Sequence, residues 1–220
     1  IYVDDAHGTG ILGRTGRGTL EHCEVESRIP YQMGTLSKAL GSAGGYLAGS
    51  ATFITYLVNT CRGFIYTTAT PPGIAAAATA AIQVIEQEPE RRTRLWRNRE
   101  RLAQGLTRLG FRLAASESPI LPVIIGDPDR AMNLAQALLT EGVYAPAIRP
   151  PTVPPATSRI RLTITADHTD EQIDRALLRF RIEREEVARR RRGAPLFDGE
   201  AGAVARRGGT LDAVVEVHHR

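Results

Sequence analysis

The N-terminal part of the chain alternates short apolar runs with glycine-rich stretches. The first run, residues 1–4, ends at Asp4, and two more occupy residues 31–35 and 44–49. Short apolar runs with turn-forming residues on both sides favour buried strands. We therefore predict three short strands in this part of the chain.

Three segments after these strands predict helices. Residues 51–61 form one helix-length run, and the alanine-rich residues 73–87 have proline at both ends. Proline is tolerated in the first turn of a helix but not inside it, so it marks the ends of the second segment. Residues 90–109 carry leucines at helical spacing among arginines, and Gly110 suits the C-cap.

After Gly110 the pattern becomes that of a small α+β unit. Apolar runs with strand spacing alternate with segments that carry helix-capping signals. The predicted elements are a strand at 119–125, a helix from an Asp127 N-cap to Gly142, a strand at 159–165 and a helix opened by a capping box at Thr169–Gln172.

These patterns divide the chain into three parts. Residues 1–89 resemble part of a larger α/β domain, and residues 90–182 form a smaller α+β domain. Residues 183–220 lose apolar periodicity and contain the run Arg189–Arg192, so we expect a disordered tail there.

The composition indicates the cellular compartment and argues against several classes of binding partner. The chain has 220 residues, a net charge of +4 at pH 7 and two cysteines, Cys23 and Cys61. Two cysteines do not make a disulfide framework, so we expect a cytoplasmic protein, and no apolar stretch is long enough to predict a membrane partner. The arginine run lacks interleaved aromatics, which argues against nucleic acid. His218 and His219 are isolated, so we expect no metal.

Composition also makes one residue informative. Of the 28 basic residues, 27 are arginine and only Lys38 is lysine. Arginine stays protonated, whereas lysine can lose its proton and attack a carbonyl as a Schiff-base nucleophile. Around it, Thr35–Gly45 supplies hydroxyls and exposed backbone N–H groups, which suit a phosphate. On composition alone, a stray surface lysine beside a glycine-rich turn is the alternative.

Three other polar residues form a pattern with Lys38. Asp4 ends a predicted strand, His7 follows three residues later, and Arg149 lies in the second unit. A carboxylate at a strand end can keep a pyridine nitrogen protonated, and a nearby histidine can bind a ring oxygen. An amine that forms an imine supplies a covalent link. These are the requirements of pyridoxal phosphate, whose ring acts as an electron sink. Taken singly, His7 could be a solvated loop residue and Arg149 a surface arginine.

Three stretches closely resemble the α-oxoamine synthases, which are pyridoxal phosphate enzymes. They are Asp4–Gly10, Thr35–Gly41 and Ala147–Pro154. The resemblance covers residues 1 to about 180. It implies an α/β protein of the aspartate-aminotransferase-like fold type I, with part of the large domain and a small C-terminal α+β domain. Ala147–Pro154 favours the branch that acts on alanine over relatives that act on glycine or serine.

The resemblance also assigns roles to residues. Asp4 is implied to pair with the pyridinium nitrogen, His7 to contact the ring hydroxyl, and Lys38 to form the imine and transfer the proton. These three are the implied catalytic residues. The other implied assignments are phosphate binding by Thr35, Ser37 and, in a neighbouring subunit, Thr67, and substrate binding by Arg149 and Thr152.

At the level of the whole protein, the resemblance implies an acyltransferase that joins an amino acid to an acyl thioester with loss of carbon dioxide. It implies a homodimer with shared active sites. The family is nearly twice as long as this chain, so we expect a C-terminal part that lacks the N-terminal half. A non-catalytic remnant with a basic tail is the alternative.

Three polar residues have more modest expectations. Asp5 should support the site or face solvent, and Arg161 should pair with a carboxylate of the small domain. His168 should orient the turn before the last helix rather than take part in chemistry.

Overall fold

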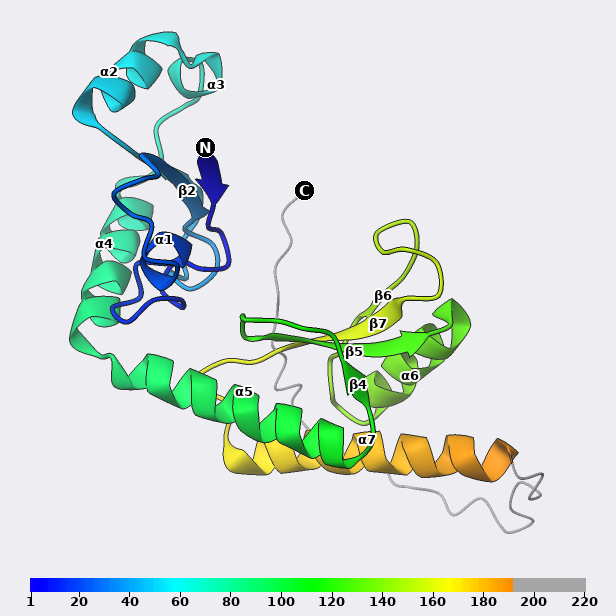
Figure 1. Cartoon of the computed structure of the whole chain (residues 1–220). Helices are drawn as coiled ribbons and strands as arrows, with labels where there is room; N and C mark the ends of the chain where they lie inside the picture. Colours follow the sequence, from blue (N-terminus) through cyan, green and yellow to red (C-terminus); the bar gives the residue numbers. More distant parts are fainter. Residues whose placement is uncertain (192–220) are drawn as a thin grey trace. The chain divides into compact units, whose positions relative to one another are not determined.

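The computed structural model describes residues 1–191, which form parts of two compact units with a boundary between Arg94 and Leu95 (Figure 1). The boundary falls a few residues after the expected division at 89/90. Helix α5, Glu90–Arg108, begins in the first unit because its first turn is tied there. The Arg92 Nη1 group donates to the carbonyl of Ile85 at 2.6 Å.

The first unit contains a three-stranded sheet in the order β1-β2-β3. Its strands are β1 (Tyr2–Asp4), β2 (Tyr31–Thr35) and β3 (Gly45–Ala48). β1 and β2 are parallel, with Asp4 opposite Met33, whereas β2 and β3 are antiparallel, with Gly34 opposite Tyr46. The three predicted strands are confirmed.

The first unit also contains two longer helices and two helices of a single turn. The two predicted helices are confirmed as α2 (Ala51–Thr60) and α4 (Pro72–Gln87), and the Ser50 side chain caps α2 by accepting from the Phe53 N–H at 3.2 Å. The sequence did not indicate α1 (Thr19–His22) or α3 (Arg62–Ile65). A single helical turn is too short to produce an apolar period.

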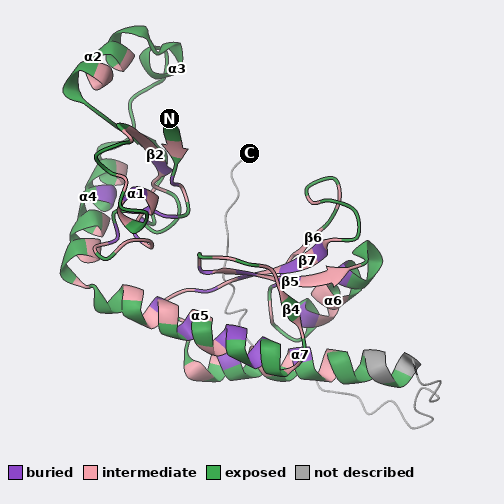
Figure 2. Ribbon diagram, viewed as in Figure 1, coloured by how far each residue is buried: buried purple, intermediate pink, exposed green. Residues whose placement is uncertain are grey.

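Few apolar side chains of the first unit are buried. In its described residues the buried apolar side chains are Leu20, Leu40 and Ala78, and α2 has no buried residue (Figure 2). Tyr56, Phe64 and Tyr66 are more than half exposed. An apolar surface of this kind marks a place where other protein packs.

The second unit is an antiparallel sheet in the order β4-β5-β7-β6, covered by helices. Alternate residues of β5 and β7 are buried, among them Leu121, Val123 and Ile160, so one face of the sheet forms the core. The strands are β4 (Arg112–Leu113), β5 (Ile120–Gly126), β6 (Ala147–Ile148) and β7 (Ser158–Thr163), and the helices after α5 are α6 (Pro128–Thr140) and α7 (Asp170–Arg191).

Helices α5 and α7 pack against each other at a glycine. A Cβ built on Gly105 would lie 2.5 Å from the Leu177 side chain, so a larger residue at this position would require Leu177 to move. Phe180 of α7 is fully buried and meets the ring of Phe111 edge to face, with 5.2 Å between the centroids.

A buried asparagine ties α5 to the segment before α7. Asn98 has no exposed surface, and its amide nitrogen donates to the carbonyls of Thr165 at 3.2 Å and His168 at 2.8 Å. The His168 ring accepts the Thr165 N–H through Nδ1 at 3.1 Å. Burial lowers the pKa of His168, which favours the neutral ring that this bond requires. The expectation that His168 orients this turn is confirmed.

The predicted start of the tail at residue 183 is wrong. Helix α7 continues to Arg191. Residues 183–191 are rich in Glu and Arg, which have high helix propensity, so the helix extends without an apolar stripe. The expectations for Arg192 and for His218 and His219 lie outside the described residues.

We expect Asn98→Ala to destabilise the second unit by about 2 kcal/mol. The substitution leaves the carbonyls of Thr165 and His168 without their donor inside the fold. Urea unfolding measures the change. Gln104→Ala on the exposed side of the same helix is the control, and we expect it to change stability by less than about 0.5 kcal/mol. Equal effects of the two substitutions would contradict this account of Asn98.

Candidate active site

The ends of two parallel strands place the main candidate residues at one edge of the first sheet. Asp4 is the last residue of β1, and Thr35 is the last residue of β2. The carboxyl ends of parallel strands meet at the same edge, where α/β proteins bind ligands. The side chain of Asp4 is exposed there, and its Oδ1 atom accepts the Ala6 N–H at 3.0 Å.

Lys38 lies in a compact turn that follows β2 directly. The turn is closed by backbone hydrogen bonds from Leu36 N–H to Gly44 at 2.9 Å and from Ser42 N–H to Leu36 at 2.8 Å. It is anchored to α4 because the Ser42 hydroxyl donates to the Ile74 carbonyl at 2.9 Å. Leu40 is buried beneath it, whereas Lys38 is exposed. The fold therefore presents the amine at the sheet edge.

Two hydroxyls and an amide gather beside Lys38. Thr35 Oγ1 and Ser37 Oγ are 2.7 Å apart, and the Ser37 N–H donates to Thr35 Oγ1 at 3.2 Å. Hydroxyl and backbone N–H groups that lie this close together in a tight turn can bind a phosphate. With an exposed carboxylate on the neighbouring strand and an exposed amine in the turn, this donor set fits pyridoxal phosphate.

His7 lies in the turn that follows Asp4. Both Gly8 and Thr9 donate their N–H groups to the Asp5 carbonyl at 3.0 Å, which closes the turn around His7. His7 is exposed. All five candidate residues of the first unit thus lie at the ends of β1 and β2 or directly after them; they are Asp4, His7, Thr35, Ser37 and Lys38.

Asp5 does not face solvent, contrary to one of the two expectations for it. It is only 1% exposed, and its carboxylate accepts hydrogen bonds from Thr19 and from the Gln32 side chain. Side chains alternate across a strand, so the residue after the exposed Asp4 points to the opposite face. Alternation indicates that the two carboxylates lie on opposite faces, but it does not indicate which of these faces is enclosed.

The other candidate residues are elsewhere in the chain. Thr67 is exposed after α3, and its hydroxyl donates to the Gly63 carbonyl. Within the described residues, no hydrogen bond or ion pair joins it to the Lys38 turn. Arg149 and Thr152 are exposed residues of the second unit, in a turn closed by the Thr152 N–H and the Arg149 carbonyl at 3.1 Å. Their roles stay predictions, as does the carboxylate partner of Arg161.

Two supporting contacts were not indicated by the sequence. Tyr46 of β3 lies over Gly34, where a Cβ would be 2.6 Å from its ring, and its hydroxyl is 2.6 Å from Thr9 Oγ1. Burial raises the pKa of Tyr46. Glu21 accepts the N–H groups of Thr15 at 2.9 Å and Arg17 at 3.0 Å. Burial acts to raise the pKa of Glu21, but these bonds outweigh it and hold the pKa below its ordinary value.

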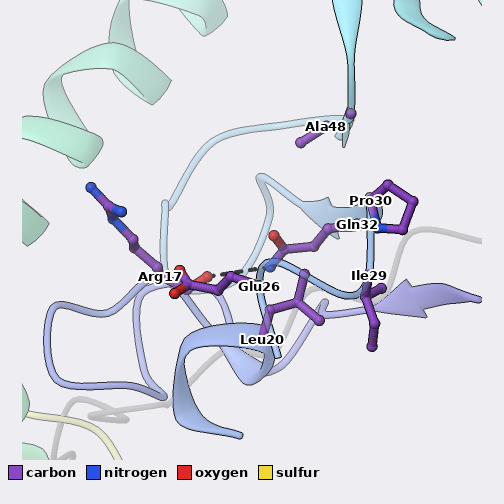
Figure 3. Close-up of a pocket in the computed structure, with 8 residues that line it drawn as sticks. Arg17, Leu20, Glu26, Ile29, Pro30, Gln32 and Ala48 are labelled. Atoms are coloured by element: carbon purple, nitrogen blue, oxygen red, sulfur yellow. Dashed lines mark hydrogen bonds between the residues drawn. The ribbon is translucent and has the colours of Figure 1, made fainter. Parts of the chain in front are cut away.

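A hollow of about 390 Å³ lies at the other end of β2 (Figure 3). It is bordered by Ile29 and Pro30 before β2 and by Ala48 at the end of the antiparallel β3. The Gln32 amide donates to the Arg17 carbonyl at 3.2 Å on its wall. Since Lys38 follows the opposite end of the strand, this hollow is separate from the candidate active site.

Two further features bear on the function class. In residues 1–191, no helix is long and apolar enough to cross a membrane. The same part of the chain has no group of three or more His, Cys, Asp or Glu residues placed to hold a metal ion.

Comparison with known families decides the relationship. The model of aminotransferase class I and II matches residues 1–180. The chain belongs to this family. An 8-amino-7-oxononanoate synthase of Symbiobacterium thermophilum is 50% identical over 179 residues, which are 81% of this chain and 46% of that protein. An 8-amino-7-oxononanoate synthase 1 of Bacillus velezensis is 46% identical over 80% of this chain and 45% of that protein.

Solved structures agree on the fold. Serine palmitoyltransferase of Sphingomonas wittichii matches with a TM-score of 0.82 and 34% identity, over 86% of this chain and 48% of that one. An 8-amino-7-oxononanoate synthase of Francisella tularensis matches with a TM-score of 0.75 and 27% identity, over 86% and 55%. The fold type I expectation and the α-oxoamine synthase resemblance are confirmed. The chain spans about half the length of the relatives that it matches.

The cofactor expectation is confirmed at the level of the family. A serine palmitoyltransferase, 35% identical and with a TM-score of 0.80, was solved with pyridoxal phosphate.

Proposed function

We propose that the protein carrying this chain is a pyridoxal phosphate-dependent acyltransferase. It condenses L-alanine with pimeloyl-CoA or a pimeloyl-carrier thioester, with loss of carbon dioxide, to give the 8-amino-7-oxononanoate of biotin synthesis. One observation carries the proposal. The only lysine of the chain is exposed in a turn beside two hydroxyls, at the sheet edge where Asp4 ends the neighbouring strand. Relatives named 8-amino-7-oxononanoate synthase at 46–50% identity support the choice of reaction.

The chemistry needs an electron sink, which the pyridine ring of pyridoxal phosphate supplies when bound. Thr35 and Ser37 bind the phosphate with their hydroxyls. Asp4 keeps the ring nitrogen protonated, because a carboxylate favours its cationic partner. His7 donates to the ring oxygen. Lys38 would hold the cofactor through its amine, and the same nitrogen would take the proton from the substrate Cα.

Substrate binding is assigned to the second unit. Arg149 has an exposed planar guanidinium that can hold a carboxylate through two parallel hydrogen bonds. Thr152 lies in the same turn and adds a hydroxyl. We assign the carboxylate of alanine to this pair.

The second candidate is condensation of glycine or serine with another acyl-CoA. The serine palmitoyltransferase structures favour it, since they match at 34–36% identity. The higher identity of the 8-amino-7-oxononanoate synthases and the stretch Ala147–Pro154 favour alanine. Turnover with each amino acid and each thioester distinguishes the two.

Borohydride reduction tests the role of Lys38. After reduction with pyridoxal phosphate, we expect one labelled peptide, which contains residues 35–41, because the cofactor bound in this turn would form its imine with Lys38, the only lysine of the chain. Mass spectrometry of a digest locates the label. Lys38→Arg keeps the charge but should lose the label. A label on the N-terminal amine alone would show that Lys38 does not bind the cofactor.

Replacement of Asp4 tests the protonated ring nitrogen. In a protein that carries this chain at the length of its relatives, we expect Asp4→Asn to retain most cofactor binding but to lower turnover about a hundredfold. An amide does not keep the nitrogen protonated, and losing such a charge contact costs on the order of 3 kcal/mol. Steady-state kinetics measures the loss. Asp127→Asn, at a helix N-cap of the second unit, is the control and should leave turnover unchanged. Full turnover of Asp4→Asn would remove Asp4 from the mechanism.

A homodimer with shared active sites is part of the proposal. Tyr56, Phe64 and Tyr66 expose apolar surface next to Thr67, which is assigned to a neighbouring subunit's phosphate. We expect light scattering of the purified chain at micromolar concentration to give at least twice the monomer mass, and Phe64→Ser to reduce association. A stable monomer at this concentration would contradict the expected interface.

A further inference from the structure

We infer that Asp5 is a positioning residue whose buried carboxylate fixes the turn carrying Asp4 and His7 against strand β2. It acts through these two residues and does not touch the cofactor. The inference rests on the proposed function, because the position of the turn matters through the ring that Asp4 and His7 would hold.

Asp4 and Asp5 lie on opposite faces of the first sheet. Residues opposite one another on paired strands share a face, so Asp4 lies on the face of Met33 and Thr35. Gln32 and Gly34 alternate with these residues and belong to the other face. Asp5 lies on that other face, because its carboxylate contacts the Gln32 side chain. Asp5 therefore supports the sheet edge from the face opposite Asp4.

The Asp5 carboxylate accepts hydrogen bonds from two residues that are distant in the sequence, Thr19 and Gln32. Oδ2 accepts from the Thr19 N–H at 3.0 Å and from Gln32 Nε2 at 2.6 Å, and Oδ1 accepts from the Thr19 hydroxyl. Thr19 is the first residue of α1, and Gln32 is in the middle of β2. The carboxylate thus joins the end of the glycine-rich loop to the strand that leads to Lys38.

The backbone of Asp5 holds the turn itself. Its N–H donates to the Met33 carbonyl of β2 at 2.8 Å. Its carbonyl accepts the N–H groups of Gly8 and Thr9, both at 3.0 Å, and the Thr9 hydroxyl at 3.0 Å. A shift of this residue therefore moves the segment that carries His7 and changes the direction of Asp4.

The surrounding chain is shaped to hold a carboxylate at this position. A Cβ on Gly8 would lie 1.9 Å from Asp5 Oδ1, and a Cβ on Gly18 would lie 1.7 Å from Oδ2. Gly18 also has a φ of +103°, a conformation that other residues rarely adopt. The two glycines leave space for the oxygens of Asp5 and for no larger group.

Tyr46 completes the support from β3. The hydroxyl proton of Thr9 is directed to the Asp5 carbonyl, so the 2.6 Å contact between Thr9 and Tyr46 is a bond donated by Tyr46. The series from Tyr46 through Thr9 to Asp5 ties the turn to the third strand as well.

Asp5→Asn tests the inference in a protein that carries this chain at the length of its relatives. An amide has one acceptor oxygen, and its NH₂ group would face a donor of Thr19 or Gln32. The first readout is hydrogen exchange without cofactor, in which we expect the amides of Gly8 and Thr9 to exchange at least tenfold faster.

The second readout is the pH titration of the visible absorption band with pyridoxal phosphate. A protonated ring nitrogen withdraws electrons from the nitrogen of Lys38. Misalignment of Asp4 should therefore raise the midpoint of this titration by about one pH unit. A variant that only unfolds more easily would show less of the band at an unchanged midpoint. Asp4→Asn is the reference and should shift the midpoint in the same direction and further.

Two other variants complete the experiment. Thr19→Val removes one donor hydroxyl and should shift the midpoint in the same direction by less, so it carries the test if Asp5→Asn does not fold. Glu21→Gln loosens the same loop at Thr15 and Arg17 without contacting the turn, and should leave the midpoint unchanged. Thr19→Ser keeps both donors and should behave as the unaltered protein.

The outcomes separate this inference from the proposed function. If Lys38 is labelled in the unaltered protein but the Asp5 and Thr19→Val variants keep its midpoint, or the amides of Gly8 and Thr9 keep their exchange rates, the positioning role is overturned and the proposed function stands. If the unaltered protein takes up no pyridoxal phosphate, both are overturned.

Discussion

The parallel pairing of β1 with β2 is the constraint on which the candidate site depends. It places the carboxyl end of each strand at one edge, so Asp4 and the turn that carries Lys38 are neighbours although 34 positions separate them in the sequence. An antiparallel pairing of the same two strands would put Asp4 beside the start of β2, next to Tyr31 and Pro30. The chemistry assigned to the two residues requires one ring to reach both, so it is available only in the parallel arrangement.

The pairing alone does not set the direction of the side chains at this edge. We infer that this direction depends on the opposite face of the sheet, where the buried carboxylate of Asp5 accepts its hydrogen bonds. Asp5 is satisfied by donors from Thr19 and Gln32, and a half-satisfied carboxylate in the same position would destabilise the fold. The site thus combines exposed groups that can change partners, such as Lys38, with buried groups that keep theirs.

The sequence predicted the elements with a clear period, and the candidate residues Asp4 and Thr35 lie at strand ends as it indicated. The three strands, helices α2 and α4 and the capping of α6 by Asp127 follow from local pattern and turn residues. Asn98 could not be found in this way, since a polar residue on an arginine-rich helix is usually solvated. Its burial is decided by carbonyls nearly seventy residues later. The donors to Asp5 are likewise long-range, and no local pattern indicates which of two adjacent aspartates is enclosed.

The two units differ in how many apolar side chains they bury. The second unit has the larger core, whereas the first unit carries most of the candidate site residues. The second unit buries Leu106, Leu121, Val123 and Phe180 almost completely and closes its own core. The first unit carries Lys38 and Asp4 but, among its described residues, buries apolar side chains only in α1, α4 and the Lys38 turn. Apolar burial is the main source of folding free energy, and further protein packed on the exposed helices of the first unit would add to it. In the proposed homodimer, packing on these helices would join assembly of the protein to the geometry of the cofactor site.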